Sequence, residues 1–363
     1  MPAQRALELL RVRDFRNLRE LEVAPGARFN VVSGDNGQGK SNLLEAIDYL
    51  GSLQSFRGAR AVELIREGAA SAELWAKVTG DVLPHEHRVR LAREGRREVQ
   101  LDGKRPRSGA SYLQALPVVL FHPGDLNLTL GSADARRGFL DRLLVRLDAV
   151  YAAALSTYTR ALASRNRLLK QETPSRKALA AYDELLASAG AVIGQARAVL
   201  SEQLAPRVVD AFAEISAGGP QVTLLYEPRV QPSVVALRAA LAEAFEKDLA
   251  RGFTADGPHA DELAVRLHET RARRYASQGQ HRAIVLALKV AELIELEQRT
   301  GNTPLLLLDD VSSELDRDKS RRFFALLNRL GGQVFLTTTR PEFIAVEGER
   351  RDFRVEAGVV QRA

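Results

Sequence analysis

The most informative stretch of this sequence is Gly34-Asp35-Asn36-Gly37-Gln38-Gly39-Lys40-Ser41. It matches the pattern G-x-x-x-x-G-K-[ST] at every fixed position. The apolar residues 29–32 precede it, and residues 42–50 follow with leucine and isoleucine at helical spacing, so the loop joins a strand to a helix that Gly51 should end. The N–H groups of such a glycine-rich loop face phosphate oxygens. The sequence therefore predicts a nucleotide-binding α/β core.

Each part of this loop has a chemical task, and all eight of its residues are candidates for binding the nucleotide. Lys40 lies at the start of the following helix and reaches the β and γ phosphates, which also makes it a candidate catalytic residue. Ser41 offers its hydroxyl to Mg²⁺, and the positive end of the helix dipole attracts the phosphates. We therefore expect ATP and Mg²⁺ as cofactors.

Two acidic residues follow a second apolar run. Residues 305–308 are four leucines, and Asp309 and Asp310 come directly after them. A strand buried on both faces has this continuous apolar pattern, and the carboxyl ends of such strands are where open α/β sheets bind ligands. Because side chains alternate along a strand, we expect the two acids on opposite sides and in different roles. We assign Asp309 to Mg²⁺ and Asp310 to catalysis on the attacking water; the alternative is a strand end followed by a helix cap.

Composition narrows the class of protein. The chain has 363 residues, of which 45% are apolar and 27% are charged, as in ordinary globular proteins. The absence of cysteine excludes disulfides, a thiolate nucleophile and cysteine-ligated metal centres. No apolar run of about 18 residues predicts a membrane span, and no signal peptide is recognisable, so we expect a cytoplasmic protein without membrane partners. The net charge of 52 − 46 = +6 favours a polyanionic partner.

The pattern along the chain divides it into three parts. Residues 71–101 alternate with period two. The hairpin-type turns Glu94-Gly95, within this range, and Asp102-Gly103, directly after it, indicate an antiparallel meander. Residues 132–216 have helical spacing almost throughout. We therefore expect an ATPase head built from residues 1–125 and 221–363, interrupted by a helical lobe at 126–220.

Two further motifs resemble those of ABC-type ATPases. Ser277-Gln278-Gly279-Gln280 stands before an amphipathic run and is similar to the signature motif, whose Ser and Gly contact the γ-phosphate from a second subunit. A small Ser-x-Gly at a helix N-terminus is physically suited to bind an anion. Ser313-Glu314-Leu315-Asp316 is similar to the D-loop. The predicted fold class is therefore α/β: an ABC-type ATPase head with a P-loop core, an antiparallel β meander and an inserted helical lobe.

Several stretches together resemble the RecF family of bacterial recombination and repair ATPases, a group with ABC/SMC-like heads. They run from the first strand nearly to the end of the chain: residues 10–18, the loop 34–41, 136–141, 158–166, Gly257-Pro258-His259, 275–280, 308–316 and 333–339. There are departures from the wider pattern. Asp125 stands where ABC proteins keep a Q-loop glutamine, a threonine of 337–339 replaces the switch histidine, and Ala260 follows His259 where the family usually has arginine.

The resemblance implies a function that spacing alone does not give. It implies an ATP-dependent homodimer in which each nucleotide lies between Lys40 of one subunit and Ser277 and Gly279 of the other. It further implies slow, DNA-stimulated ATP hydrolysis and binding to double-stranded DNA, single-stranded DNA and their junctions. The implied role is recombinational repair and replication restart, with RecR and RecO loading RecA at single-strand gaps in support of the SOS response.

One basic segment is a candidate for the DNA contact. Residues 88–107 contain eight basic and three acidic residues, a local balance of 8 − 3 = +5. Phosphate contacts need only accessible positive charge, so Arg93, Arg96 and Arg97 near the expected hairpin tip are predicted to contact DNA. The alternative is a solvated strand face. A second candidate cluster precedes the signature motif: Arg266, Arg271, Arg273 and Arg274.

Two other function classes are open from the sequence. An ABC subunit coupled to a membrane transporter is disfavoured by the basic hairpin and the inserted helical lobe. A purely architectural SMC-like DNA clamp without a mediator role would be expected to carry long heptad arms and a cysteine hook, which this sequence lacks.

Overall fold

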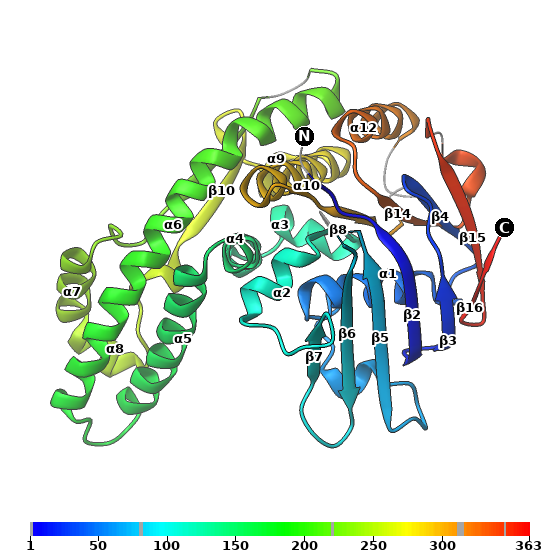
Figure 1. The fold of residues 1–363 in the computed structure, drawn as a ribbon. Helices are drawn as coiled ribbons and strands as arrows, with labels where there is room; N and C mark the ends of the chain where they lie inside the picture. Colours follow the sequence, from blue (N-terminus) through cyan, green and yellow to red (C-terminus); the bar gives the residue numbers. More distant parts are fainter. Residues whose placement is uncertain (1–2, 80–82, 219–220, 311–315, 345) are drawn as a thin grey trace. The chain divides into compact units, whose positions relative to one another are not determined.

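A computed structural model describes residues 3–79, 83–218, 221–310, 316–344 and 346–363 (Figure 1). The chain divides into two compact units: unit 1 comprises residues 1–125, 211–219 and 285–363, and unit 2 comprises 126–210 and 220–284. The sequence predicts a lobe at 126–220 and a head that includes all of 221–363. Residues 211–219 belong instead to unit 1, and residues 221–284 belong to unit 2. The strands between residues 222 and 271 belong there because they hydrogen-bond to one another in a separate three-stranded sheet.

Unit 1 contains a six-stranded sheet of order β16-β15-β4-β14-β13-β8, in which every neighbouring pair is parallel except β15 and β16. Its parallel strands β8, β13 and β14 are buried along their whole length, as predicted for 305–308. The strands are β4 (Phe29–Ser33), β8 (Val118–Phe121), β13 (Leu305–Leu308), β14 (Val334–Thr338), β15 (Arg350–Glu356) and β16 (Val359–Arg362).

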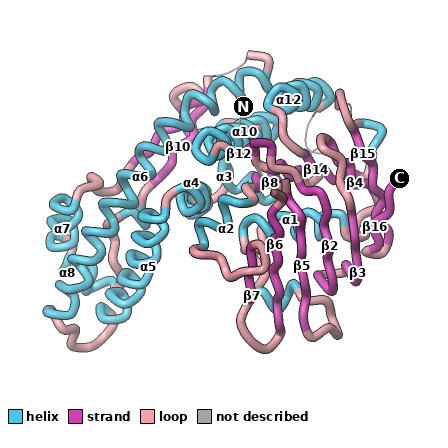
Figure 2. The backbone as a smooth tube through the Cα atoms, in the orientation of Figure 1, coloured by secondary structure: helices cyan, strands magenta, loops and turns pink. Residues whose placement is uncertain are grey.

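A second, antiparallel sheet of unit 1 has the order β3-β2-β5-β6-β7 and includes the predicted meander (Figure 2). Burial alternates strictly along β5, so one face of this sheet contributes to the core and the other faces solvent. The strands are β2 (Leu7–Phe15), β3 (Leu18–Val23), β5 (Ser71–Val78), β6 (His85–Ala92) and β7 (Glu98–Leu101).

Helix α1 (Lys40–Ser52) packs in the core that the two sheets of unit 1 share. Its residues Leu43 and Ile47 are buried there beside Leu74 of β5 and Val118 of β8. The predicted stop at Gly51 is wrong, because the helix continues through it to Ser52. A Cβ on Gly51 would lie 2.4 Å from a side-chain carbon of Val118, so glycine is needed there for the close approach of β8.

The rest of unit 1 surrounds these sheets. Helix α12 buries Phe323, Phe324, Leu326 and Leu327. Helix α10 begins in unit 2 and continues into unit 1 at Val285. The further helices and strands are β1 (Ala3–Gln4), α2 (Gly109–Ala115), α10 (Gln278–Thr300), β12 (Asn302–Thr303) and α12 (Arg317–Leu330).

Unit 2 is mainly helical, as expected for its first part. Helix α6 is 41 residues long and continues past Pro206. The elements are α3 (Asn127–Leu130), α4 (Ala133–Leu147), α5 (Ala149–Leu169), α6 (Arg176–Ser216), β9 (Val222–Glu227), α7 (Val234–Glu243), α8 (Phe245–Arg251), β10 (Glu262–Leu267), β11 (Thr270–Arg271) and α9 (Ala272–Tyr275). In the part of the chain that the structure describes, no helix is both long enough and apolar enough to span a membrane.

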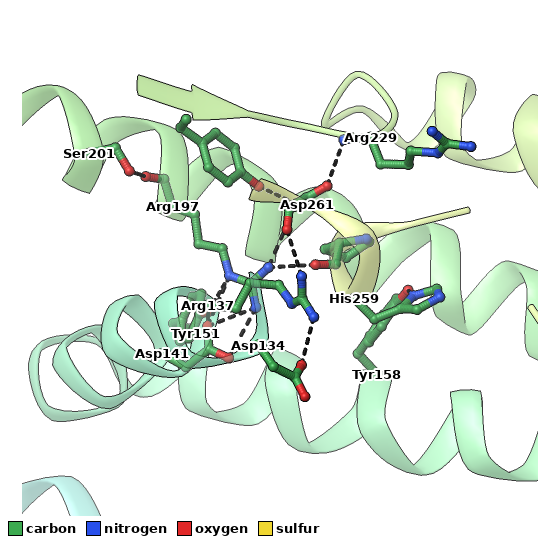
Figure 3. Close-up of polar contacts among 12 residues, drawn as sticks. Asp134, Arg137, Asp141, Tyr151, Tyr158, Arg197, Ser201, Arg229, His259 and Asp261 are labelled. Carbon is green, nitrogen blue, oxygen red and sulfur yellow. Dashed lines mark hydrogen bonds and ion pairs between the residues drawn. The ribbon is translucent and has the colours of Figure 1, made fainter. Parts of the chain in front are cut away.

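Buried polar groups hold unit 2 around the stretch Gly257-Pro258-His259 (Figure 3). Arg197 of α6 is 3% exposed and donates hydrogen bonds to both carboxylate oxygens of Asp141 and to the Pro258 carbonyl. Burial lowers the pKa of His259, which keeps the ring neutral at pH 7. Its Nε2 lies 3.0 Å from the Thr254 carbonyl and must donate there, so its Nδ1 accepts the Tyr158 hydroxyl at 2.7 Å.

A second buried arginine joins three helices of unit 2. Arg165 of α5 is fully buried and donates to Asp183 of α6 at 2.6 Å and to Asp248 of α8 at 2.7 Å. Replacing it with Met should lower the free energy of unfolding by about 3–5 kcal/mol, because the partner carboxylates would be left buried without a cation. Urea denaturation followed by circular dichroism measures this. Arg238→Met, in the half-exposed pair with Glu184, should cost less than about 1 kcal/mol.

The double variant Arg165→Met/Asp248→Leu shows whether the loss of stability comes from an unpaired buried carboxylate or from lost packing. If the unpaired carboxylate dominates, the double variant should be more stable than Arg165→Met alone. Losses that simply add would contradict the proposed importance of the ion pair.

Candidate nucleotide-binding site

The glycine-rich loop connects β4 to α1, as the sequence predicts. Gly34 has φ 147°, and a Cβ there would lie 2.4 Å from the carbonyl oxygen of Val355, so only glycine fits beside β15. The Lys40 ammonium donates to the carbonyls of Gly34 at 2.7 Å and Asp35 at 2.8 Å, and thus folds back over the loop. Burial lowers the pKa of Lys40, and the nearby carboxylates of Asp310 and Asp309 partly offset this effect.

The two acids stand just beyond β13 and are fixed by Thr337 at the end of β14. The Thr337 hydroxyl donates to Asp309 Oδ1 at 2.7 Å and accepts the Asp310 N–H at 2.9 Å. The expectation that the acids lie on opposite sides is wrong. Strand β13 ends at Leu308 and Asp310 has a φ of 54°, so strand alternation does not extend to it, and both acids line one pocket.

That pocket has a volume of about 290 Å³ and brings together groups from four places in the sequence. It contains the loop, both acids, the threonine and an arginine from the segment after α1. Its lining residues are Asn36, Gly37, Gly39, Lys40, Ser41, Asn42, Arg57, Asp309, Asp310 and Thr337. An ammonium, a hydroxyl and two carboxylates thus surround a space beside the start of α1. The remaining predicted loop residues, Gly34, Asp35 and Gln38, belong to the same loop but are not among its lining residues.

Two residues that sequence reasoning missed support this pocket. Arg57 lines it and donates to the Asn42 side chain at 2.7 Å, while Asn17 accepts from Asn42 at 2.8 Å and donates to the Gln38 carbonyl at 3.0 Å. Asn17 lies in the stretch 10–18, which resembles the RecF family, so the sequence contains a weak indication that it belongs to the site. The sequence contains no such indication for Arg57, because it lies in an irregular segment without a motif.

A larger hollow adjoins this pocket and shares Asn42 and Arg57 with it. It has a volume of about 800 Å³ and also involves Arg16, Asn17 and Arg93. Arg16, which lines this hollow, pairs with the fully buried Glu45 at 2.9 Å, and Glu45 also accepts the Ser55 hydroxyl at 2.6 Å. The pocket therefore adjoins a wider space that is lined by several exposed cations.

The signature-like motif lies in unit 2, apart from the unit that carries the pocket. The Ser277 hydroxyl accepts the Gln280 N–H at 3.3 Å, and the Gln280 side chain accepts the Ser277 N–H at 2.7 Å, so Ser277 caps α10. Ser277 is exposed and Gly279 is half-buried. A capping role accounts for the serine structurally, and its exposure leaves it accessible to another molecule.

Two other predicted features have different outcomes. Residues 313–315 of the D-loop lie outside the described residues, and Asp316 caps α12 by accepting the Lys319 N–H at 2.9 Å. Asp125, the candidate in place of the Q-loop glutamine, is buried and engaged by the His122 N–H at 2.9 Å and Lys289 at 3.4 Å, away from the pocket lining. Within the described ranges, no group of three or more histidines and acids is placed to hold a metal ion.

The predicted DNA residues form the turn between β6 and β7, and all three are exposed. Arg93 donates to the carbonyls of Ala69 and Arg66, at 2.7 and 3.1 Å. Arg97 donates to the Tyr49 hydroxyl at 3.2 Å. Arg96 makes no hydrogen bond or ion pair to any residue that the structure describes. Two of the three arginines therefore brace the turn, and Arg96 presents its charge to solvent.

Comparison with known proteins identifies the family of this chain. The family model for the RecF/RecN/SMC N terminal domain matches residues 6–357. A DNA replication and repair protein RecF from Anaeromyxobacter sp. (strain Fw109-5) is 43% identical over 362 residues, 97% of each chain. The RecF of Myxococcus xanthus (strain DK1622) is 42% identical over 344 residues, covering 91% of this chain and 90% of the relative.

Solved structures also show similarity to RecF. A structure of the recombination mediator protein RecF-ATP in the RecFOR pathway has a TM-score of 0.91 and 30% identity, covering 100% of this chain and 99% of the other. A Pyrococcus furiosus Smc head domain has a TM-score of 0.59 at 18% identity, covering 99% of this chain and 96% of the other, and so shares the fold. The fold is therefore that of an ABC-type ATPase head, and the chain belongs to the RecF family of DNA replication and repair proteins.

Proposed function

We propose that this chain is a DNA-binding ATPase in which ATP joins two copies and hydrolysis lets them separate. The observation that carries the proposal is the pocket in which Lys40, Ser41, Asp309 and Asp310 meet, together with the exposed Ser277 in the other unit. The solved relative whose printed name includes ATP supports ATP as the nucleotide.

The triphosphate is held by the loop. Lys40 leaves its contacts with the Gly34 and Asp35 carbonyls for the β and γ phosphates, and the N–H groups at the start of α1 face the same oxygens. The adjoining hollow next to Asn42 and Arg57 has space for the ribose and base. Gly34 to Ser41 therefore bind the nucleotide as one unit, as the motif requires.

The donor set of the pocket fits Mg²⁺. Ser41 provides a hydroxyl and Asp309 a carboxylate, the hard oxygen ligands that this ion prefers. When bound, Mg²⁺ neutralises charge on the β and γ phosphates. Thr337 holds the Asp309 carboxylate in place, and Asp310 orients the attacking water and takes up its proton. ABC ATPases usually have glutamate at the position of Asp310, and the shorter carboxylate is consistent with slow turnover.

The dimer completes the site. The nucleotide held by Lys40 of one copy meets Ser277 and Gly279 of the other, where the N-terminus of α10 attracts the γ-phosphate. The exposure of Ser277 supports this arrangement, because its hydroxyl can reach a second molecule. ATP binding thereby controls a dimer that holds double-stranded DNA, single-stranded DNA and their junctions. DNA is expected to stimulate the weak hydrolysis.

Family membership supports a place in recombinational repair in the cytoplasm. The related protein named for the RecFOR pathway supports partners of the RecR and RecO type, which act with this chain in loading RecA at single-strand gaps. That activity would support replication restart and the SOS response.

The β6–β7 turn provides a test of the DNA-binding part of the proposal. In ATP, the slope of log affinity for duplex DNA against log salt should flatten by about 0.9 in Arg96→Ala, because a free cation loses one phosphate contact. Removing Arg93, Arg96 and Arg97 together should weaken binding to all sequences alike. Fluorescence anisotropy over a salt series, in ATP and in ADP, measures both effects, and ATP should strengthen wild-type binding.

Arg19 offers a matched control, since it is exposed and lies on β3, at the other edge of the same sheet. Arg19→Ala should leave the slope unchanged. Equal slopes for the wild type and Arg96→Ala would remove the turn from the DNA surface, and equal affinity in ATP and ADP would contradict control by ATP.

A further inference from the structure

We infer that unit 2 carries a separate surface that binds single-stranded DNA. This surface consists of residues 167–177 and 245–253, and we call it the lobe tip. It is formed by the C-terminal end of α5, the N-terminal end of α6 and helix α8, which lie together in Figure 1. The inference deepens the proposed function, because it rests on DNA being the partner of this chain.

The lobe tip stands on a fixed base. The buried Arg165 ties α5 to α6 through Asp183 and to α8 through Asp248. The Asn166 side chain accepts the Thr254 N–H at 2.8 Å, which fastens the segment after α8 to α5. Residues presented by the three helix ends therefore keep their positions relative to one another.

The lobe tip has an excess of exposed positive charge. Two exposed acids, Glu172 and Glu246, oppose six exposed cations, a balance of 6 − 2 = +4, while Asp248 is buried against Arg165. Arg176 pairs only loosely with Glu246, at 3.4 Å, where both side chains are at least three-quarters exposed. The six cations are Arg167, Lys170, Arg176, Lys177, Lys247 and Arg251.

Helix dipoles explain only part of this charge. Arg167, Lys170 and Arg251 lie at helix C-termini, where cations are favourable. Arg176 and Lys177 lie in the first turn of α6, which contains no acid, so the dipole disfavours them. The chain uses arginine far more often than lysine, but this preference does not explain the charge of the lobe tip. Three of the eight lysines of the chain lie in this small surface. Cations at positions where the helix dipole is unfavourable to them indicate a ligand with negative charge.

An exposed aromatic residue points to single strands. Phe253 follows α8 and is 47% exposed, and the neighbouring Gly252 packs beside the Lys170 side chain. Positive charge that follows the backbone, combined with an aromatic on which a base stacks, is how proteins bind single-stranded nucleic acid without reading its sequence. The turn at 93–97 has cations but no aromatic residue, so it lacks the second requirement.

The test uses the full-length chain and fluorescent oligonucleotides of one length, single-stranded or duplex. Lys170→Gln/Lys177→Gln should flatten the salt slope for the single strand by up to about 1.4, or about 0.7 for each phosphate contact. Arg142→Gln/Arg160→Gln removes two exposed charges elsewhere in unit 2 and should change the slope little.

Substitutions at Phe253 test stacking separately from charge. Phe253→Leu should weaken single-strand binding about five- to tenfold, at the low end of the range for one stacked base, and should leave duplex binding unchanged. Phe253→Trp keeps an aromatic face and should retain the affinity. Equal losses in the leucine and tryptophan variants would overturn the stacking contact.

Other outcomes are equally decisive. A loss confined to duplex DNA in the lysine variant would assign the lobe tip to duplex and overturn the inference. Single-strand affinities and slopes equal to wild type in the lysine and leucine variants would show that the lobe tip binds no DNA, and an acidic protein partner would then be the candidate. If the wild type bound neither oligonucleotide, the proposed function itself would fail. If the wild type bound them and its variants had the same affinity, only the inference about the lobe tip would fail.

Discussion

Asp310→Asn should stop ATP hydrolysis while leaving ATP binding and dimerisation intact. The Asp310 N–H is held by Thr337, so an amide side chain keeps the local backbone but cannot accept a proton from water. Loss of a general base commonly lowers turnover by about 10²–10⁴-fold. Single-turnover hydrolysis, measured beside an ATP titration, tests this expectation. The ATP-bound dimer should accumulate in this variant.

Asp309→Asn is the matched variant, because it makes the same chemical change one residue earlier. It removes a charged ligand that the pocket offers to Mg²⁺, so it should weaken Mg²⁺-dependent ATP binding as well as turnover. Asp310→Glu restores a carboxylate and should retain hydrolysis. If Asp310→Asn lost ATP affinity while Asp309→Asn kept it, the two roles would be reversed.

Ser277→Arg should abolish the ATP-dependent dimer and leave ATP binding by the isolated chain largely intact. The serine is exposed and belongs to unit 2, whereas the residues that line the pocket belong to unit 1. A long cation at this position therefore disturbs the surface offered to a second copy and leaves the residues that line the phosphate pocket unchanged. Equilibrium ATP binding and sedimentation velocity measure the two properties.

Loss of the helix cap must be separated from the effect of bulk at this position. Ser277→Ala removes the hydroxyl that accepts the Gln280 N–H and should cost about 1 kcal/mol of stability. It introduces no bulk, so its dimer should be weakened rather than abolished. A Ser277→Arg variant that dimerised normally in ATP would exclude the composite site.

The sequence predicted those parts of the site that depend on local spacing. The loop 34–41 and the two acids are each set by residues adjacent in the chain, and strand–loop–helix chemistry is local. Thr337 contacts both acids only because β14 pairs with β13 in a parallel register, which places residue 337 beside residue 309. Such a contact depends on sheet order, which the pattern along the chain did not specify.

The predictions from sequence that were wrong also have physical explanations. Helical periodicity cannot show that Gly51 lies where β8 approaches α1, so its lack of a side chain was read as a helix stop. Alternation along β13 was extended to Asp310, although its positive φ takes it out of the strand. The strands β9, β10 and β11 have patterns like those of the head strands, and only their hydrogen-bond partners assign them to a separate sheet.

ATP should close a site that is shared by two copies of the chain. The most direct test of this expectation is the mass of Asp310→Asn in solution, measured by light scattering in Mg²⁺ with and without ATP. We expect a mass of 39.9 kDa without ATP and twice that value, 2 × 39.9 = 79.8 kDa, with ATP. A chain that stayed at 39.9 kDa while saturated with ATP, over the micromolar range, would exclude the shared site.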